Sequence, residues 1–463
     1  MFHRRDAMIH LGQLGAGGVS LPMLLQCQDA AAKSGPLAKP KASADACIYI
    51  FLWGGPPQQD TWDMKPDAPE GIRSIYKPID TNVPGLSICE LMPKLAKQMD
   101  KVAVVRSLSH KSNNHEPSVY HMLTGRQNPA LVVPRNARTR SDFPSFGSVL
   151  SAFAPHSDIP AFATVPRPIG HDGVTYAGTH AGFLGPKFDP LERSAAKGVR
   201  EPETHPLTPL PDFPEARLVA REGLRKLLEK QDDGLQRGRL GNDLDAYRDR
   251  AMRMIASPRV RGAFDIERES PRMRDRYGRN EYGESFLLAR RLVEAGVKAV
   301  SITWTYIAPN GAVNNVWDNH GATASLGGIS GFAMLKEKYC LPPLDCGLSA
   351  LLEDLADRGM LDRTMVAVAG EFGRTPKINA NGGREHWGAA QTGLLAGGGI
   401  RGGQIYGKTD KIAAYPTDNP VSPEEWLATL YRAMGLAPES EVADREGRPH
   451  RISDGHAVSS LFG

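Results

Sequence analysis

Carboxylate and imidazole side chains follow four segments of the chain that have the composition of buried strands. The polar residues after these segments are Asp60 and Asp63, then His110, His115 and Ser118, then Asp318 and His320, and finally Glu371, Arg374, Arg384 and His386. Carboxylates and imidazoles without cysteine form a donor set that suits Zn, Mn, Fe or Ca and argues against a thiolate site. A single loop aspartate usually caps a helix or forms a turn. The combination predicts a metal site, with a purely structural polar cluster as the alternative.

The second group of polar residues lies at the start of a predicted helix, in the sequence HEPSVYHMLTGR at positions 115–126. Pro117 suits the first turn of a helix, where its missing N–H costs nothing. His115 and Glu116 would then lie at the helix N-terminus, where free N–H groups and the helix dipole favour an anion. Helical spacing places Ser118 on the same face as His115. We expect an anion-binding helix start beside the metal site, as a phosphate or sulfate ester requires.

The elements that must position these residues alternate between strands and helices. Apolar, β-rich runs occupy positions 46–55, 101–109, 297–306 and 363–373, and amphipathic helical stretches occupy 281–296 and 344–360. This alternation predicts an α/β fold with a mostly parallel central sheet and helices on both faces. In such open sheets, ligands bind beyond the carboxyl ends of the strands. The predicted fold therefore brings the four groups of polar residues together.

The first 43 residues have the pattern of an export signal followed by a linker. Arg4 and Arg5 precede a weakly apolar stretch and then the sequence AAAKSGPLAKPKASA. This order is typical of a twin-arginine signal, and a short buried helix is the alternative. The apolar run is too short and too interrupted for a stable membrane span of about 20 residues. We expect export by the twin-arginine translocase and a periplasmic or extracellular location.

Composition and charge restrict the domain organisation and the partners. The chain has 463 residues, 41% of them hydrophobic, and its formal net charge of +4 is spread without a basic tract. Nucleic acid is therefore not an expected partner. We expect one α/β domain over residues 44–463, with a charged helical insertion at 192–279 whose charges contact solvent. Cys340 and Cys346 could form a disulfide after export or remain buried thiols.

Taken together, the motifs resemble those of the alkaline phosphatase superfamily, and of sulfatases in particular. Sulfatases carry a Cys/Ser-x-Pro-Ser-Arg signature that runs on to Leu-Thr-Gly-Arg, and segment 115–126 matches it at Pro117, Ser118 and the final LTGR. More closely, the chain is similar to a large family of exported bacterial proteins of unassigned function, described as sulfatase-like. The shared motifs are GGPPQQDTWD at 54–63, WDNHG at 317–321, RYG before LLARRLVEAGV, GEFGRTP at 370–376 and GREHW at 383–387. Each motif is weak alone, but their order along nearly the whole chain is specific.

The resemblance implies an alkaline phosphatase-like α/β fold and a metal site assembled from the residues after the strands. The implied ligands are Asp60, with Asp63 as its alternative, and Asp318, His320, Glu371 and His386. Phe372 occupies the position of a histidine in an acidic–His pair, so only the carboxylate of Glu371 remains there. We expect one or two divalent ions (Zn, Mn or Ca), and Arg374 or Arg384 as the clamp for the anion. Asp318, His320 and His386 would leave a position for water, which is the usual arrangement of a catalytic site.

The chain departs from the sulfatase pattern at the nucleophile. His115 stands where sulfatases place Cys or Ser, and Val119 stands where they place Arg. A hydrolase could instead use a metal-activated water, or His115 or Ser118 could be the nucleophile. We expect an exported metal-dependent hydrolase of sulfate or phosphate esters, with sulfated polysaccharides as a candidate substrate class. A non-catalytic metal- or anion-binding protein on the same scaffold is the alternative, and a phosphomutase-like transferase is disfavoured because its sugar phosphates are intracellular.

Overall fold

The computed structural model describes residues 40–192 and 257–463, except for short gaps at 129–136, 156, 158, 172–173, 309–310 and 312. Residues 1–39 of the predicted export signal and residues 193–256 of the predicted insertion lie outside the described residues. Residues 42–463 form one compact unit. In the described part of the predicted insertion, two short helices form, α7 (Pro258–Phe264) and α8 (Pro271–Tyr277).

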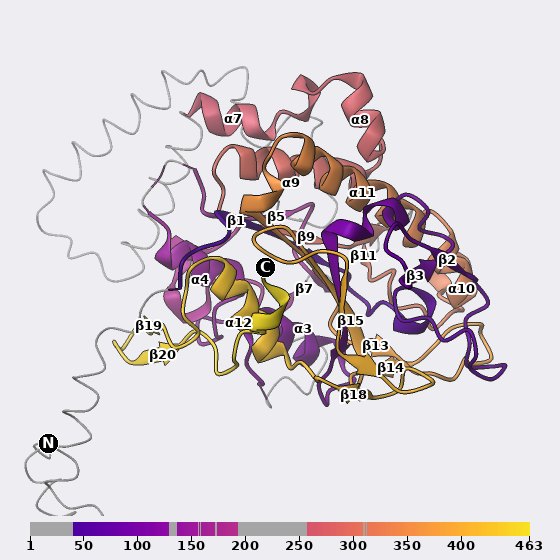
Figure 1. Cartoon of the computed structure of the whole chain (residues 1–463). Helices are drawn as coiled ribbons and strands as arrows, with labels where there is room; N and C mark the ends of the chain where they lie inside the picture. The colour runs from indigo at the N-terminus through magenta and orange to yellow at the C-terminus, as the bar shows by residue number, and fades with distance from the viewer. Residues whose placement is uncertain are drawn as a thin grey trace, which may run out of the picture. The chain divides into compact units, whose positions relative to one another are not determined.

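An eight-stranded sheet forms the centre of this unit (Figure 1). In spatial order its strands are β16 (Gln404–Tyr406), β4 (Val102–Leu108), β15 (Gln391–Ala396), β12 (Thr364–Ala369), β1 (Ala46–Phe51), β9 (Ala299–Thr303), β5 (Phe162–Val165) and β8 (Leu191–Glu192). β15 pairs antiparallel with both of its neighbours, and every other neighbouring pair in the sheet is parallel. The predicted α/β fold with a mostly parallel central sheet is confirmed.

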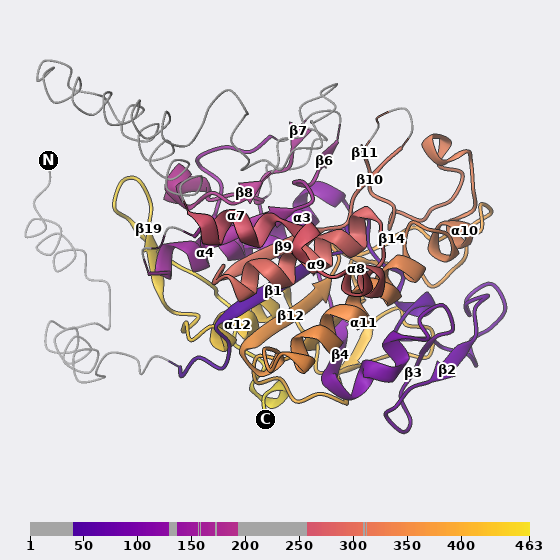
Figure 2. The same ribbon diagram turned by 90° about the horizontal axis from the view of Figure 1, so that it is seen from above.

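Helices cover both faces of the sheet (Figure 1, Figure 2). On one face lie α7, α8, α9 (Glu281–Glu294) and α11 (Leu341–Asp357), and on the other lie α3 (His115–Thr124), α4 (Phe146–Phe153) and α12 (Pro423–Ala433). Ile48 and Ile50 of β1 pack into the first core, whereas Cys47, Tyr49 and Phe51 pack into the second. Successive side chains of a strand point to opposite faces. A strand that is apolar at every position is therefore buried on both sides.

Smaller elements surround the sheet. The two-stranded ladders are β2 (Pro78–Asp80) with β3 (Ser87–Cys89), β6 (Gly170–His171) with β7 (Val174–Thr175), β10 (Tyr306–Ile307) with β11 (Val313–Asn314), β13 (Gly373–Arg374) with β14 (His386–Trp387), β17 (Lys408–Thr409) with β18 (Pro416–Asp418), and β19 (Glu441–Ala443) with β20 (Pro449–Arg451). A short helix, α10 (Gly331–Lys336), precedes α11.

Cys340 and Cys346 are separate thiols and form no disulfide with each other. In the described part of the chain, no helix has the length and hydropathy to cross a membrane.

The carboxyl ends of four strands lead into the predicted site residues. β4 continues through a short loop into α3, which begins at His115. β9 leads through the β10–β11 ladder to Asp318 and His320, and β12 leads directly to Glu371. Shortly after β1 comes a pair of glycines with positive φ, Gly54 and Gly55. Because β1, β4, β9 and β12 run in one direction, all four ends lie at the same edge of the sheet.

Candidate metal centre

Three imidazoles and one carboxylate meet beyond these strand ends, and we refer to His115, Asp318, His320 and His386 as the His/Asp cluster. The Nε2 atoms of His320 and His386 lie 2.8 Å apart, and they lie 2.8 and 3.0 Å from Oδ1 of Asp318. Nε2 of His115 lies 3.3 Å from the other oxygen of Asp318. The four side chains are 13–30% exposed, so the cluster is accessible from solvent.

The outer nitrogen of each imidazole is fixed by an acceptor. Nδ1 of His386 donates to the backbone carbonyl of Asn113 at 2.8 Å. Nδ1 of His115 lies 2.6 Å from Oε1 of Glu371, and Nδ1 of His320 lies 2.6 Å from Oε2 of Glu385. A carbonyl or carboxylate oxygen holds the proton on Nδ1, which leaves Nε2 as the atom with a lone pair. This is the arrangement by which proteins orient histidines that bind metals.

The charge state of the cluster follows from the same contacts. Burial opposes the charged form of His115, but hydrogen bonds with Asp318 and Glu371 outweigh burial and raise its pKa to about 9. Burial likewise opposes the charge of Asp318, yet Arg374 and the histidines hold the pKa of that carboxyl well below its usual range. Burial lowers the pKa of His386. Metal-free His115 is therefore protonated on both nitrogens at neutral pH, and a metal ion at the cluster must displace the proton from its Nε2.

These contacts allow a test of whether the cluster fits a metal ion. Nε2 of His320 lies 2.8 Å from Nε2 of His386 and 2.8 Å from Oδ1 of Asp318, and Nη1 of Arg374 lies 3.4 Å from it. Two imidazole nitrogens at that distance require either a proton or a metal ion between them. His115, Asp318 and His386 also each offer a ligand atom within 4.8 Å of the others. This group of two nitrogens and one carboxylate, with Nε2 of His320 beside Asp318 and His386, fits a divalent transition metal.

Arg374 lies at the cluster, but its guanidinium is engaged by the protein. The side chain is fully buried, and Nη2 donates to Oδ1 of Asp318 at 2.6 Å. Nε donates to the carbonyl of Gly55 at 2.9 Å, and Nη1 donates to the carbonyl of Arg384 at 3.0 Å. All three nitrogens therefore have protein acceptors. The geometry favours a role in holding Asp318 over the predicted role as an anion clamp.

Asp60 and Arg384 pair with each other instead of joining the cluster. Both side chains are fully buried, with Nε to Oδ2 at 2.7 Å and Nη2 to Oδ1 at 3.0 Å. Arg384 also donates to the backbone carbonyls of Ile72, Thr375 and Pro376. Both oxygens of Asp60 are thus occupied by a guanidinium, which disfavours the predictions of Asp60 as a metal ligand and Arg384 as an anion clamp.

The alternative first-strand ligand, Asp63, lies in another polar group. Its buried carboxylate contacts Lys65 at 2.9 Å and Arg106 at 3.3 Å and accepts a hydrogen bond from Thr409. Three donors from the protein balance its charge, which is the arrangement of a structural ion pair. The structure therefore places Asp63 in the scaffold and not among the groups of the cluster.

Ser118 and Glu371 lie beside the cluster and make contacts of their own with the protein. The hydroxyl of Ser118 is buried and lies 3.4 Å from the carbonyl of Ser112, so it does not face the cluster as a nucleophile would. The buried carboxylate of Glu371 accepts from His115 and from the backbone N–H of Gly54. It thus contacts the outer nitrogen of His115, on the side of the ring away from Asp318.

Two groups that complete the cluster are absent from the predicted site. Glu385 lies in the GREHW motif directly before His386, and its acidic character was the available signal. Asn113 contributes its backbone carbonyl, which no residue type encodes. His115 itself was predicted as a nucleophile or a ligand, and its contacts with Asp318 and Glu371 favour the ligand.

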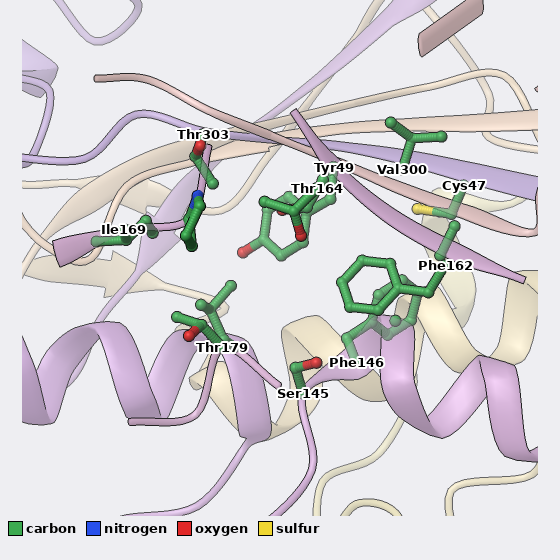
Figure 3. Close-up of a pocket in the computed structure, with 15 residues that line it drawn as sticks. Cys47, Tyr49, Ser145, Phe146, Phe162, Thr164, Ile169, Thr179, Val300 and Thr303 are labelled. Atoms are coloured by element: carbon green, nitrogen blue, oxygen red, sulfur yellow. The ribbon is translucent and has the colours of Figure 1, made fainter. Parts of the chain in front are cut away.

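A separate cavity lies between the sheet and α4 (Figure 3). Its walls include Tyr49 of β1, Phe146 of α4 and Phe162 of β5, and no residue of the His/Asp cluster lines it. Its volume of ≈ 20 Å³ has room for about one water molecule. This cavity is a packing gap in the second core, and the His/Asp cluster remains the candidate functional site.

Several solved structures resemble the chain in backbone. The phosphonate monoester hydrolase SpPMH from Silicibacter pomeroyi is 13% identical, with a TM-score of 0.38 over 91% of this chain and 76% of that chain. The PsFucS1 sulfatase from Pseudoalteromonas sp. is 15% identical, with a TM-score of 0.39 over 94% of this chain and 74% of that chain. The lipoteichoic acid synthase LtaP from Listeria monocytogenes is 10% identical, with a TM-score of 0.36 over 91% of this chain and 77% of that chain.

The comparison at the level of sequence families identifies the chain's family. No curated protein matches the chain in sequence. The profile of a family described as "Protein of unknown function (DUF1501)" matches residues 44–462. That range covers the strands, the helices and every residue of the His/Asp cluster. The family of unassigned function that the motifs indicate is thereby confirmed, and the chain belongs to the DUF1501 family.

Proposed function

We propose that the protein is a metal-dependent hydrolase of sulfate or phosphate esters, with one divalent ion held by the His/Asp cluster. The observation that carries this proposal is the convergence of three imidazole Nε2 atoms on Asp318, each imidazole held at Nδ1 by a protein acceptor. The amide of Asn315 and the guanidinium of Arg374 approach Nε2 of His115 and of His320 at 3.4 Å. A metal ion would give these nitrogens and Asp318 a shared partner.

The ligand atoms of the cluster limit which metal ions can bind and how many of them bind. Three imidazoles and a carboxylate suit Zn, Mn or Fe. Calcium, which the sequence left open, prefers six to eight oxygen ligands and is disfavoured by this set. The carboxylate of Asp60, the ligand predicted after the first strand, is occupied by Arg384. We therefore propose one ion per chain.

The start of α3 supports the recognition of an ester. His115 is the first residue of this helix, and the side chain of its N-cap residue, Asn114, makes no capping hydrogen bond. The first N–H groups of a helix lack partners within the helix. In α3 these are the N–H groups of His115 and Glu116, because Pro117 has none, and the side chain of His115 belongs to the His/Asp cluster. An anionic ester at the cluster would meet these N–H groups and the positive end of the helix dipole.

Neither the hydroxyl of Ser118 nor the imidazole of His115 is free to attack an ester, so water is the proposed attacking group. Ser118 is buried against Ser112, and His115 is held between Asp318 and Glu371. A divalent cation, when bound, would polarise the ester oxygen and lower the pKa of a water molecule. The protein's own contribution is to fix the imidazoles through Glu371, Glu385 and Asn113, and to hold Asp318 through Arg374.

The substrate and the location belong to the same proposal. We propose export by the twin-arginine translocase through the segment that begins at Arg4 and Arg5, and action outside the cytoplasm. Sulfated polysaccharides are the proposed substrate class, because the 115–126 segment resembles the sulfatase signature. A non-catalytic binding protein on this scaffold is the second candidate. It is favoured by one observation, which is that the guanidinium groups of Arg374 and Arg384 are occupied by the protein.

The experiment that separates these candidates is metal analysis followed by hydrolysis assays. Purified protein loaded with Zn, Mn or Fe is offered aryl sulfates, aryl phosphates, phosphodiesters and sulfated oligosaccharides. The hydrolase proposal predicts turnover that disappears in His386→Ala and persists in Ser118→Ala. Binding of metal without turnover of any ester would favour the binding protein. Absence of bound metal in the loaded wild type would contradict the hydrolase proposal and a metal-binding role, and would leave only anion binding.

A further inference from the structure

We infer that Glu371 is a positioning residue of the metal centre and not one of its ligands. The inference rests on the proposed function, because it concerns the ion that the His/Asp cluster would hold. The resemblance to sulfatases implied a ligand at this position. The contacts of Glu371 instead connect His115 with the backbone N–H of Gly54, a residue whose carbonyl is bound by Arg374, the partner of Asp318.

The carboxylate of Glu371 is held by two donors from the protein. Oε1 accepts from Nδ1 of His115 at 2.6 Å, and the N–H of Gly54 lies 2.9 and 3.0 Å from the two oxygens. The side chain is fully buried. Nε2 of His110 donates to the backbone carbonyl of Glu371 at 2.5 Å, which fixes the main chain of the residue as well. A carboxylate held in this way has little freedom to turn toward the centre of the cluster.

The carbonyl of Gly54, which lies in the next peptide unit, supports Asp318 through Arg374. The carbonyl of Gly54 accepts a hydrogen bond from Nη2 of Arg374, and the same nitrogen donates to Oδ1 of Asp318. Gly54 has a φ of +121°, and a Cβ at this position would lie 2.2 Å from the backbone nitrogen of Asp318. Only glycine permits both this backbone conformation and this close approach.

One residue of the β1 end thus sets the positions of two ligands. Through its N–H and Glu371 it holds the imidazole of His115, and through its carbonyl and Arg374 it holds the carboxylate of Asp318. A carboxylate on Nδ1 fixes the tautomer and raises the basicity of the Nε2 atom that binds metal. Glu371 therefore controls metal affinity without contacting the ion.

The test is a titration of metal-free protein with Co²⁺, read by its visible spectrum and by the metal bound per chain. For Glu371→Gln we expect one Co²⁺ per chain and the wild-type spectrum, because the ligands are unchanged. The dissociation constant should rise about 10- to 100-fold, as is typical for loss of an outer partner of a metal ligand. A changed Co²⁺ spectrum in Glu371→Gln would show that the carboxylate is a ligand, and would overturn the inference while leaving the metal centre intact.

Two control variants separate the loss of an outer partner from the loss of a metal ligand. Glu385→Gln removes the carboxylate from His320, but Glu385 is 56% exposed and screened by solvent. It should therefore weaken binding less than Glu371→Gln does. His386→Ala removes a ligand and should change both the stoichiometry and the spectrum.

A crystal structure of the Co²⁺-loaded wild type gives a second reading that does not depend on the folding of a variant. The inference predicts that Glu371 stays on His115 Nδ1 and the Gly54 N–H, whereas a Glu371–Co²⁺ bond would overturn it. A wild type that binds no Co²⁺ would refute the proposed function and the inference together. Failure of the inference alone and failure of the proposed function therefore give different results.

Discussion

Replacing either partner of the buried Asp60–Arg384 ion pair should destabilise the protein and leave its metal content unchanged. Both side chains are fully buried and joined by two hydrogen bonds of 2.7 and 3.0 Å. Removal of one partner from a buried pair costs about 3–5 kcal/mol, because a charge remains without its counterion. Asp60→Asn leaves Arg384 with three carbonyl acceptors, so we expect about 3 kcal/mol. Arg384→Met leaves the carboxylate without its donors, so we expect about 5 kcal/mol.

Urea unfolding at pH 7, together with metal analysis of each folded variant, measures both quantities. The double variant should lose about 1–3 kcal/mol less than the sum of the two single losses, because the residues are coupled. Metal content should stay at the wild-type value in Asp60→Asn. Loss of metal in Asp60→Asn, with unfolding free energy within about 0.5 kcal/mol of wild type, would refute the reasoning, since surface-like effects are of that size. That result would restore Asp60 as a ligand.

Three further predictions concern other parts of the chain. Ser118→Ala should leave metal affinity and any hydrolysis within about twofold of wild type, since the hydroxyl faces Ser112 and not the cluster; a loss of turnover with metal retained would make Ser118 a catalytic residue. Burial raises the pKa of Glu424, but the hydrogen bond from His121 outweighs burial and lowers that pKa to about 2 from 4.5. The charged form therefore stabilises the fold above about pH 4.5, and this contribution fades as pH falls toward 2; Glu424→Gln should cost about 1–3 kcal/mol at pH 7 and progressively less in acid, and a difference that grows in acid would have the wrong sign. Replacing Arg4 and Arg5 with lysine should retain the protein in the cytoplasm, which cell fractionation can measure; unchanged export would contradict a twin-arginine signal.

The central fold could be predicted because its signals are local and redundant. The run at Ala46–Phe51 is apolar at every position, and such a strand is stable only where both faces are covered. The same pattern occurs in β4, β9 and β12, which lie in one sheet with β1. The antiparallel direction of β15 was not predictable in this way. An apolar strand has the same composition in either direction. Its direction depends on the connection that leads the chain back to the sheet.

The cluster could be predicted in part, because strand ends indicate which residues gather at one edge. Asp318, His320 and His386 do lie together, and His115 joins them from the start of α3. Proximity to an edge does not determine which side chain faces which. Asp60 follows a strand like the others, yet a guanidinium from a residue 324 positions later occupies it.

The roles of Arg374 and Arg384 could likewise not be predicted from the sequence. Arg374 and Arg384 occur in motifs beside the ligands, and an arginine near a predicted anion site suggests a clamp. Both guanidinium groups donate to backbone carbonyls, those of Gly55, Pro376 and Ile72. Backbone acceptors leave no trace in residue type, so the sequence could place these arginines near the site but could not distinguish support from substrate binding.

The most direct test of the account is the metal bound per chain in the wild type and in His320→Ala/His386→Ala, measured on folded protein after loading with zinc and removal of excess. We predict about one ion per chain in the wild type and almost none in the double variant, with circular dichroism spectra that agree. The two histidines are partly exposed, so their replacement should spare the fold. Full occupancy in the double variant, or no bound metal in the wild type, would contradict the assignment of the His/Asp cluster as a metal centre.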